Sequence, residues 1–284
     1  MRCRFTAVRL LAFTFWLGTI PLAGVAQTHA AVDIGGRKLD VVRFGAGGPA
    51  VVFEVGLADS LDTWIPVATT VGELTTAIVY SRAGFGRSDP SPDGYGVRHA
   101  ATDLHALLHK LPVQPPFILV ARSYGGIIAR LYTSLFPDDV AGLVLVDASH
   151  ERQVKEWGRI DSTYPGAFRV YYDSVLKTLP GGPEAAEIRE TVRIQAAGAV
   201  EGLTPLPDIP IAVITSMKSD STARYVNGTA RGHEVWRALH DEWFRRTRNG
   251  IHIETTRSGH GIQDTEPGLV GNAIRFVLDR VRAK

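Results

Sequence analysis

The sequence predicts an α/β fold: a doubly wound, mostly parallel sheet with one helical insertion. Continuous apolar runs such as AVVF (50–53), FILV (117–120) and IAVI (211–214) indicate strands that are covered on both faces, as in a parallel sheet. These runs alternate with segments of helical apolar spacing, which is the pattern of βα units. One long stretch, residues 149–209, breaks the alternation and predicts the insertion.

The alternation assigns each element in order. Strands are expected at residues 38–44, 50–55, 76–81, 117–121, 141–146, 211–215 and 251–256. Helices are expected at 98–111, 125–136, 234–246 and 267–281, and the last of these carries apolar residues at the i, i+3, i+4 spacing of one buried face. Residues 30–44, which turn at Gly35 and Gly36, predict an antiparallel hairpin at one edge of the sheet.

The stretch 149–209 contains amphipathic helical pieces separated by prolines, and it contains no convincing strand. Structureless connections of this length are uncommon in compact domains, so we expect a helical lid. The lid divides the core into residues 31–148 and 210–284. Four aromatic residues gather in it, namely Tyr164, Phe168, Tyr171 and Tyr172.

Composition excludes several classes of protein. The chain has 284 residues, of which 45% are hydrophobic and 21% charged, so it is not a disordered, collagen-like or multi-span membrane protein. The 31 basic residues nearly balance the 29 acidic ones, and nothing indicates a nucleic-acid partner.

The N-terminus has the three-part layout of a secretory signal peptide. A basic start precedes an apolar run at 10–22, and small residues then offer cleavage after Ala26 or Ala30. We therefore expect residues 1–30 to be a signal peptide and the mature chain to be exported, periplasmic or secreted, with no stable membrane span. The alternative is an uncleaved membrane anchor, although the apolar run is shorter than the roughly 20 residues that a spanning helix needs.

Removal of this leader changes the chemistry of the chain. Three arginines leave with residues 1–26, so 28 basic residues face 29 acidic ones in the mature chain. Cys3 is the only cysteine and leaves as well. The mature chain is therefore expected to hold no internal disulfide and no cysteine metal site.

The strongest local signal for chemistry is FILVARSYGGIIARLY, residues 117–132. A buried strand ends, Ser123 occupies a tight turn, and an apolar helix begins at once, which is the context of a nucleophile elbow. Gly125 follows the expected pattern, whereas Ala121 replaces the leading glycine. The alternative interpretation is an ordinary serine that caps a helix.

Four stretches in the same order resemble the α/β-hydrolase family over nearly all of residues 38–281. They are FEVGLADSLDTW (53–64), YSRAGFGRSDP (80–90), ARSYGG (121–126) and TRSGHGIQDTEP (256–267). The segment LVLVDASHERQ (143–153) further resembles a bacterial subgroup of exported or cytoplasmic hydrolases. The resemblance implies the fold, a serine nucleophile and a catalytic histidine.

His260, between Gly259 and Gly261, matches the loop that carries the base in this family. A serine hydroxyl needs such a base within hydrogen-bond reach. The sequence offers two candidates for the acid that orients the base. Asp147, directly after the strand that precedes the lid, is favoured over Asp220, which follows the strand at 211–215. Either acid also has a structural explanation, as a strand-end cap or as a solvated loop residue.

An oxyanion hole needs two backbone N–H donors. Tyr124, immediately after Ser123, is expected to supply one donor. By the resemblance, Gly56 occupies the position of the loop glycine and Leu57 supplies the other donor. Val55 stands where the family has a histidine, so the side-chain contribution of that histidine is lost.

No metal or organic cofactor is expected. His105 and His109 are four residues apart on a predicted helix, a spacing that suits a metal, but the sequence offers no evident third ligand. A solvated helix face is the favoured interpretation of this pair.

Together these residues predict a serine hydrolase that cleaves a carboxylic ester or a related small acyl compound through an acyl-enzyme. Ser123 argues against the related enzymes that use an aspartate nucleophile, the haloalkane dehalogenases and epoxide hydrolases. Two alternatives stay open: a non-catalytic ligand-binding protein on the same fold, and hydrolysis of an amide, a peptide or a carbon–carbon bond. The sequence leaves the substrate and the oligomeric state undetermined.

Overall fold

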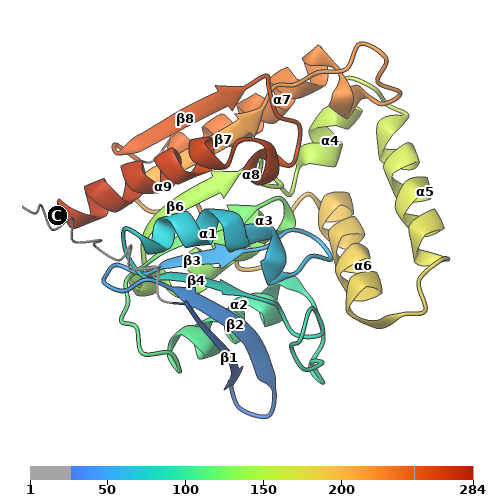
Figure 1. Cartoon of the computed structure of the whole chain (residues 1–284). Helices are drawn as coiled ribbons and strands as arrows, with labels where there is room; N and C mark the ends of the chain where they lie inside the picture. The colour runs from blue at the N-terminus through green and yellow to red at the C-terminus, as the bar shows by residue number, and fades with distance from the viewer. Residues whose placement is uncertain (1–26, 246, 284) are drawn as a thin grey trace, which may run out of the picture.

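A computed structural model describes residues 27–245 and 247–283. Its single sheet has eight strands in the order β1-β2-β4-β3-β5-β6-β7-β8. The β1–β2 and β2–β4 pairs are antiparallel and the other pairs are parallel, which confirms the predicted fold class (Figure 1). The strands are β1 (Gln27–Asp33), β2 (Lys38–Phe44), β3 (Val51–Glu54), β4 (Ala77–Tyr80), β5 (Phe117–Arg122), β6 (Val140–Val146), β7 (Ile211–Ser216) and β8 (Gly250–Thr255).

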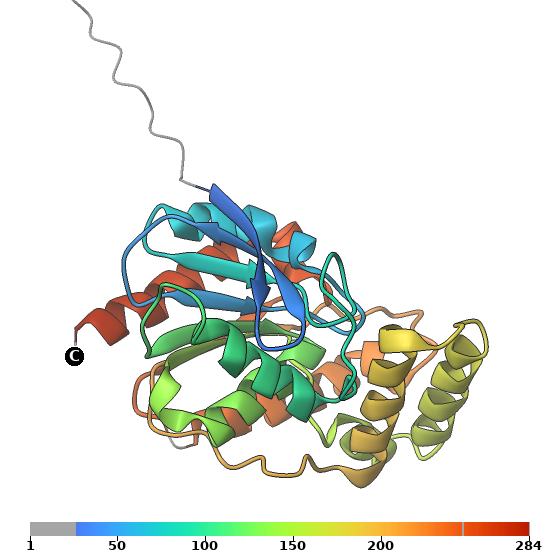
Figure 2. The same cartoon turned by 90° about the horizontal axis from the view of Figure 1, so that it is seen from below.

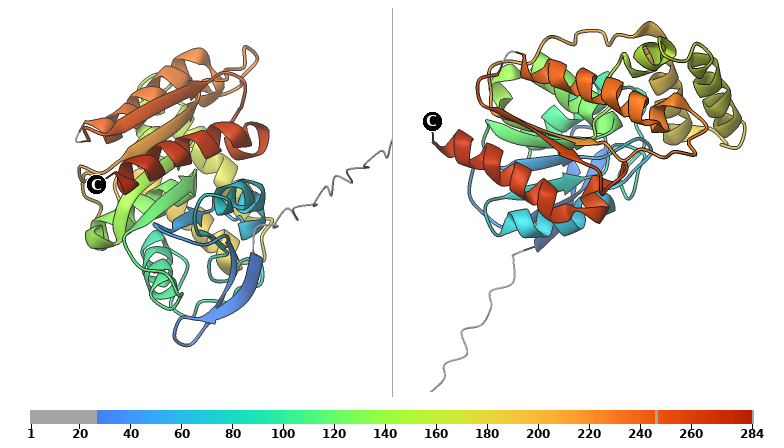
Figure 3. Two further views of the ribbon diagram at one scale, coloured as in Figure 1. Left: turned by 60° about the vertical axis from the view of Figure 1, so that its left-hand side comes forward. Right: turned by 90° about the horizontal axis from the view of Figure 1, so that it is seen from above.

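Helices cover both faces of the sheet, which is why its strands are apolar on both sides. Helices α1 (Ile65–Gly72) and α9 (Pro267–Arg282) pack on one face against Val51 and Phe53. Helices α2 (Val97–Leu108) and α3 (Tyr124–Leu135) pack on the other face against Val52. Alternate residues of β3 therefore enter two different apolar cores, and α9 runs across the sheet surface as Figure 3 shows.

Three helices, α4 (Gln153–Gly158), α5 (Tyr164–Leu176) and α6 (Gly182–Ala197), form the segment between β6 and β7. They project beyond the ends toward which the parallel strands point, with α5 and α6 at the side of the molecule (Figures 1 and 2). Buried side chains join α4 and α5 to α7 (Ala230–Asp241), and these include Trp157, Tyr164 and Trp236. A smaller helix, α8 (Ile262–Thr265), precedes α9.

Helices α1 and α7 differ from the sequence expectation, and the short helix α8 was not expected either. Helix α1 was not predicted, because IPVATTVG combines a proline with β-branched residues and has little charge patterning; burial against the sheet stabilises it. Helix α7 begins at Ala230 because the Thr229 side chain accepts a hydrogen bond from Gly232 N and caps it. It ends at Asp241 and continues as a short 3-10 helix, η4 (Glu242–Phe244).

The edge hairpin is present as β1 and β2, and β1 begins at Gln27, four residues before the mature core boundary expected from sequence. Most of the predicted signal peptide, with Cys3, lies outside the described residues. Among the residues that are described, no helix is long and apolar enough to cross a membrane.

Candidate active site

Ser123 occupies a sharp turn between β5 and α3. Its backbone has φ 51° and ψ −125°, a region that costs a non-glycine residue energy and that persists only where the surroundings hold it. Ser123 N donates to Val146 O (3.3 Å), and Ser123 O accepts from Ser149 N (2.8 Å). The strand β6 and the turn that follows it therefore clamp the strained residue on both sides.

The neighbouring glycines allow this turn to pack closely against other backbone. A Cβ at Gly125 would lie 2.4 Å from Val55 O, and one at Gly126 would lie 2.4 Å from the Cβ of Ala148. Real Cβ atoms do not come so close, so both positions require glycine. Ala121, where the usual motif has glycine, is fully buried in β5, where its methyl group fits in the apolar core.

His260 lies in the loop between β8 and α8 and links two of the side chains predicted from sequence. Its Nδ1 is 2.7 Å from Asp147 Oδ2, and its Nε2 is 2.9 Å from Ser123 Oγ. A carboxylate can only accept, so Nδ1 carries the proton and Nε2 accepts from the serine hydroxyl. The three side chains form one continuous hydrogen-bonded chain at the carboxyl edge of the sheet.

Asp147 follows β6 and is buried, with φ 43°. Its second oxygen, Oδ1, accepts from Trp236 Nε1 (2.7 Å) and from Ser216 N (2.9 Å). Burial acts to raise the pKa of this carboxyl, but the hydrogen bond and charge of His260, with Trp236, outweigh burial and hold the pKa below its ordinary value. Asp147 is therefore an ionised, fixed partner for the imidazole.

Asp220, the other acid considered from sequence, has no contact with His260. It is exposed, and its Oδ1 accepts from Thr222 N (2.8 Å) and Thr222 Oγ1 (2.7 Å) within its own turn. These bonds lower the pKa of Asp220 through local hydrogen bonding alone. The structure thus brings Asp147, and not Asp220, to the histidine.

The two backbone donors expected for an oxyanion hole border the same cavity as Ser123. Tyr124 is the first residue of α3, so its N–H has no partner within the helix. Among the described residues, Leu57 N–H has no hydrogen-bond acceptor. Both N–H groups are therefore available to a bound oxygen.

A buried ion network that sequence reasoning missed supports the loop of Leu57. Arg82, in the loop after β4, donates to Val55 O (3.0 Å) and Gly56 O (2.7 Å). Its guanidinium lies between Glu54 of β3 (2.6 Å) and Glu187 of α6 (2.7 Å). A buried charge needs such partners. The arginine in YSRAGFG was the only sequence signal for this network, and no sequence pattern predicts its partners.

Glu187 also holds the loop directly. Its Oε2 accepts from Ala58 N at 2.9 Å, one residue after Leu57. Ala58 has φ 54°, so this part of the loop is held in a conformation that alanine rarely adopts. Helix α6 of the insertion is therefore connected to the backbone that carries one of the two expected donors.

A cavity of about 560 Å³ opens above Ser123 and His260. All four aromatic residues that the sequence grouped in the insertion line it, and Trp157, Tyr225 and Trp236 add further rings. Polar groups also face it, among them Lys218, Gln153 and Gln195. The cavity thus combines an aromatic wall with a few hydrogen-bonding groups, as small-molecule sites do.

The pair His105 and His109 lies outside this cavity, on α2. Sequence reasoning found no third ligand for it, but Asp139 lies 3.0 Å from His105 Nδ1 and 2.9 Å from His109 Nε2. The expectation of a merely solvated helix face was therefore wrong about the surroundings of these two histidines. Asp139 lies 30 residues beyond His109 in the chain, and only the packing of α2 against α3 brings it near.

Comparison with known proteins agrees with this fold. The sequence profile of the alpha/beta hydrolase fold matches residues 49–191. An esterase of Mycobacterium tuberculosis (strain H37Rv) is 26% identical over 290 residues, which cover 91% of this chain and 90% of the esterase. These similarities support a hydrolase activity.

Two solved structures share the fold. A thermophilic esterase from Thermogutta terrifontis superposes with a TM-score of 0.60 at 17% identity, over 90% of this chain and 99% of the esterase. An epoxide hydrolase superposes with a TM-score of 0.59 at 18% identity, over 88% of this chain and 98% of the hydrolase. Because different reactions occur on this fold, it does not by itself define the reaction. The matched profile and the full-length similarity place the chain in the alpha/beta hydrolase fold family.

Proposed function

We propose that the protein is a serine hydrolase that cleaves a small carboxylic ester, with Ser123 as nucleophile, His260 as base and Asp147 as the orienting acid. The observation that carries the proposal is the continuous chain of hydrogen bonds from Asp147 through His260 to Ser123 Oγ, at 2.7 and 2.9 Å. The esterase relative that is similar over nearly the full length supports the same bond type.

The geometry suits acyl transfer in two steps. Ser123 Oγ attacks the acyl carbon while His260 Nε2 takes the hydroxyl proton, and the N–H groups of Leu57 and Tyr124 hold the oxyanion. His260 then gives the proton to the departing alcohol, which leaves an acyl group on Ser123. A water molecule, deprotonated by His260, attacks this acyl-enzyme and releases the carboxylic acid and the free serine.

The cavity favours an ester with an apolar or aromatic group of moderate size. Its volume of about 560 Å³ lies within the range of small-molecule sites, and rings dominate its wall. The insertion supplies most of these rings, from α4 and α5, so it acts as a lid over the acyl or alcohol group. Tyr164 and Phe168 lie on the side of α5 that faces the cavity.

Intact mass after treatment with a fluorophosphonate probe tests the nucleophile. The wild-type chain should gain one adduct, and Ser123→Ala should gain none because the activated hydroxyl is absent. Ser149→Ala is the matched control, since Ser149 lines the same cavity and only its backbone contacts Ser123. It should label as the wild type does.

A panel of p-nitrophenyl esters of increasing acyl length tests the reaction. Turnover that is lost in Ser123→Ala and kept in Ser149→Ala supports ester hydrolysis. A folded wild-type protein that neither labels nor turns over any ester would contradict the proposal and favour a ligand-binding protein on the same fold. Labelling without ester turnover would direct the search to amide or carbon–carbon substrates.

A further inference from the structure

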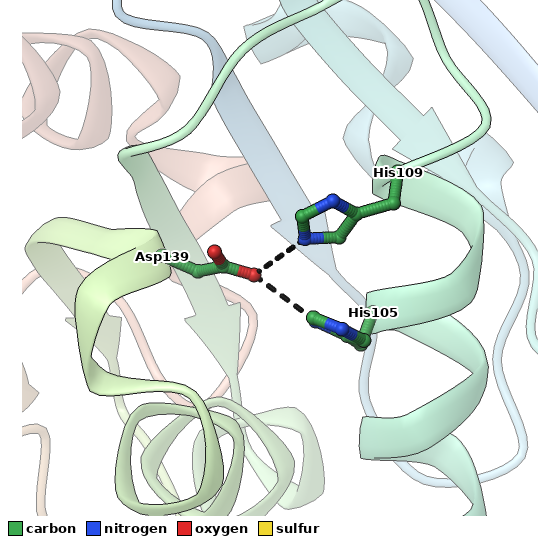
Figure 4. Close-up of side chains that lie close together, drawn as sticks. All are labelled: His105, His109 and Asp139. Atoms are coloured by element: carbon green, nitrogen blue, oxygen red, sulfur yellow. Dashed lines mark hydrogen bonds and ion pairs between the residues drawn. The ribbon is translucent and has the colours of Figure 1, made fainter.

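We propose that His105, His109 and Asp139 form a structural binding site for a divalent transition-metal ion of the zinc class. This inference goes beyond the hydrolase reaction and does not depend on it. The three side chains are the one group of three such ligands that the described residues bring together, and their ligand atoms all lie within 4.8 Å of one another. Figure 4 shows both imidazole rings directed at the same carboxylate oxygen of Asp139.

The ligands come from two rigid elements. His105 lies in α2, and His109 caps its C-terminal end one turn later, so both rings project from one side of the helix. Asp139 ends the short 3-10 helix η2 (Pro137–Asp139), which leads into β6. Since η2 and α2 are far apart in sequence, a bound ion would add a link between two segments that side-chain packing and the hydrogen bonds to Asp139 already hold together.

The surroundings orient the ligands. The His105 ring is stacked on Phe136, with 3.8 Å between centroids and 7° between planes. Tyr132 donates its hydroxyl hydrogen to Asp139 Oδ2 at 2.9 Å. Such outer contacts are typical of metal sites, where a second set of residues fixes the direction of the ligands. The carboxylate is nearly buried while His109 is about half exposed, so an ion has an entry path from solvent.

The distances fit an ion after a small adjustment. Tetrahedral zinc with bonds of about 2.0 Å separates its ligand atoms by roughly 3.3 Å. Asp139 Oδ2 is now 3.0 Å from His105 Nδ1 and 2.9 Å from His109 Nε2. Opening these two distances by about 0.3 to 0.4 Å would match the ion. The two imidazole nitrogens lie within 4.8 Å of each other, and rotation of the exposed His109 side chain brings them toward the same separation.

The donor set selects the class of ion. Two imidazole nitrogens and one carboxylate oxygen suit zinc, cobalt, nickel or copper, whereas calcium and magnesium prefer oxygen ligands alone. A water molecule would complete the tetrahedron on the solvent side.

The position of the site indicates a structural role. Asp139 precedes β6 and Asp147 follows it, so the seven residues of the strand separate the two acids. At about 3.3 Å per residue this is a distance of more than roughly 20 Å. None of the three ligands lines the cavity above Ser123. An ion here would stabilise the fold and would take no part in hydrolysis.

Isothermal titration of the metal-stripped, untagged protein with zinc chloride tests the site, and cobalt chloride provides a second readout. The wild type should bind one zinc ion per chain with a Kd in the micromolar range or lower. Zinc should raise the Tm of the wild type by several degrees. Cobalt should give the visible absorption bands of tetrahedral coordination. His109→Gln, an exposed substitution that should not disturb folding, should weaken binding at least tenfold. The double variant His105→Gln/His109→Gln should abolish all three signals.

His99→Gln is the matched control, because His99 lies on α2 but outside the group of ligands. It should bind zinc as the wild type does. The proposal is overturned if the wild type takes up no zinc and shows no rise in Tm. It is equally overturned if the double variant binds zinc with unchanged affinity, since the ion would then occupy another histidine.

Discussion

Asp147 illustrates how much a single residue of this site depends on its surroundings. It is buried and accepts three hydrogen bonds, from His260, Trp236 and the backbone of Ser216. An ionised carboxylate in this position fixes the tautomer of the imidazole and would stabilise its charged form during the proposed reaction. A substitution that removes the charge of Asp147 but keeps the shape of its side chain isolates this effect.

We therefore expect Asp147→Asn to lower kcat by about 10³- to 10⁴-fold, because an amide also offers a donor and favours the wrong tautomer of His260. KM for the same ester should change little. Asp220→Asn is the matched control and should leave kcat within twofold, since Asp220 bonds only within its own turn. Steady-state kinetics on one ester decides the matter, and equal losses in both variants would contradict the assignment.

Two buried histidines predict a marked loss of stability in acid. Burial lowers the pKa of His150 to about 3 and that of His240 to about 4. Unfolding returns both to about 6.5, so the unfolded chain binds more protons than the native chain between these values. The free energy of unfolding should thus fall as pH drops from about 6.5 to 4, by several kcal/mol in all.

Urea unfolding at pH 7, 6, 5 and 4 measures the slope of the free energy of unfolding against pH. His150→Gln should flatten it, because one of the two extra proton sites of the unfolded chain is removed. His99→Gln, which leaves both His150 and His240 in place, should keep the wild-type slope. A slope that is the same in all three proteins would show that other groups dominate acid unfolding.

Among the elements, α6 is connected through Glu187 to the loop that carries Leu57. Glu187 pairs with Arg82 and accepts from Ala58 N, next to the proposed donor Leu57. The insertion thus supports the loop of the proposed oxyanion hole and also lines the cavity. A change at Glu187 should therefore affect both stability and turnover.

We expect Glu187→Gln to destabilise the fold by about 3 kcal/mol, because it leaves Arg82 buried with one carboxylate fewer. It should also lower kcat more than it raises KM, since the oxyanion donor loses its support. Glu190→Gln on the same helix is the control: its pair with Arg193 is exposed and only three residues away, so the expected cost is below about 1 kcal/mol. Urea unfolding and ester kinetics measure the two effects, and a fall in stability without any change in kcat would reject the link to the loop.

For the molecule as a whole, the pairing of strand β1 helps to locate the cleavage site of the predicted signal peptide. We propose that the chain is exported and that cleavage follows Ala26. All seven residues of β1, Gln27 to Asp33, pair with β2. Cleavage after Ala30 would remove four of them, together with His29 and its contact with Asp40 at 2.5 Å.

The N-terminal sequence of protein recovered from a bacterial periplasm or culture medium checks this proposal. It should begin at Gln27. A chain that begins at Ala31, or that stays full-length in the membrane fraction, would contradict the proposed cleavage. Replacement of Ala26 by a bulky residue such as Phe should block processing and serves as the control.

Local patterns in the sequence predict the layers of the fold and identify two of the candidate site residues. Continuous apolar runs identify strands because burial on both faces demands them, and Ser123 is recognisable because a strand, a tight turn and a helix follow one another within a few residues. His260 was found through its glycine-flanked loop and its family resemblance. These signals are local, so they need no knowledge of which strands are neighbours.

The contacts between residues far apart in the chain depend on the assembled fold. Asp147 reaches His260 because β6 and β8 flank β7, a strand order that sequence pattern does not encode. The partner of Arg82 on α6 and the third member of the His105 group depend in the same way on helix packing. Such contacts join residues that are roughly 30 to 110 positions apart. No sequence pattern around these residues predicts which distant residue each will contact. The contacts are favourable only in the assembled fold, because burial there strengthens them.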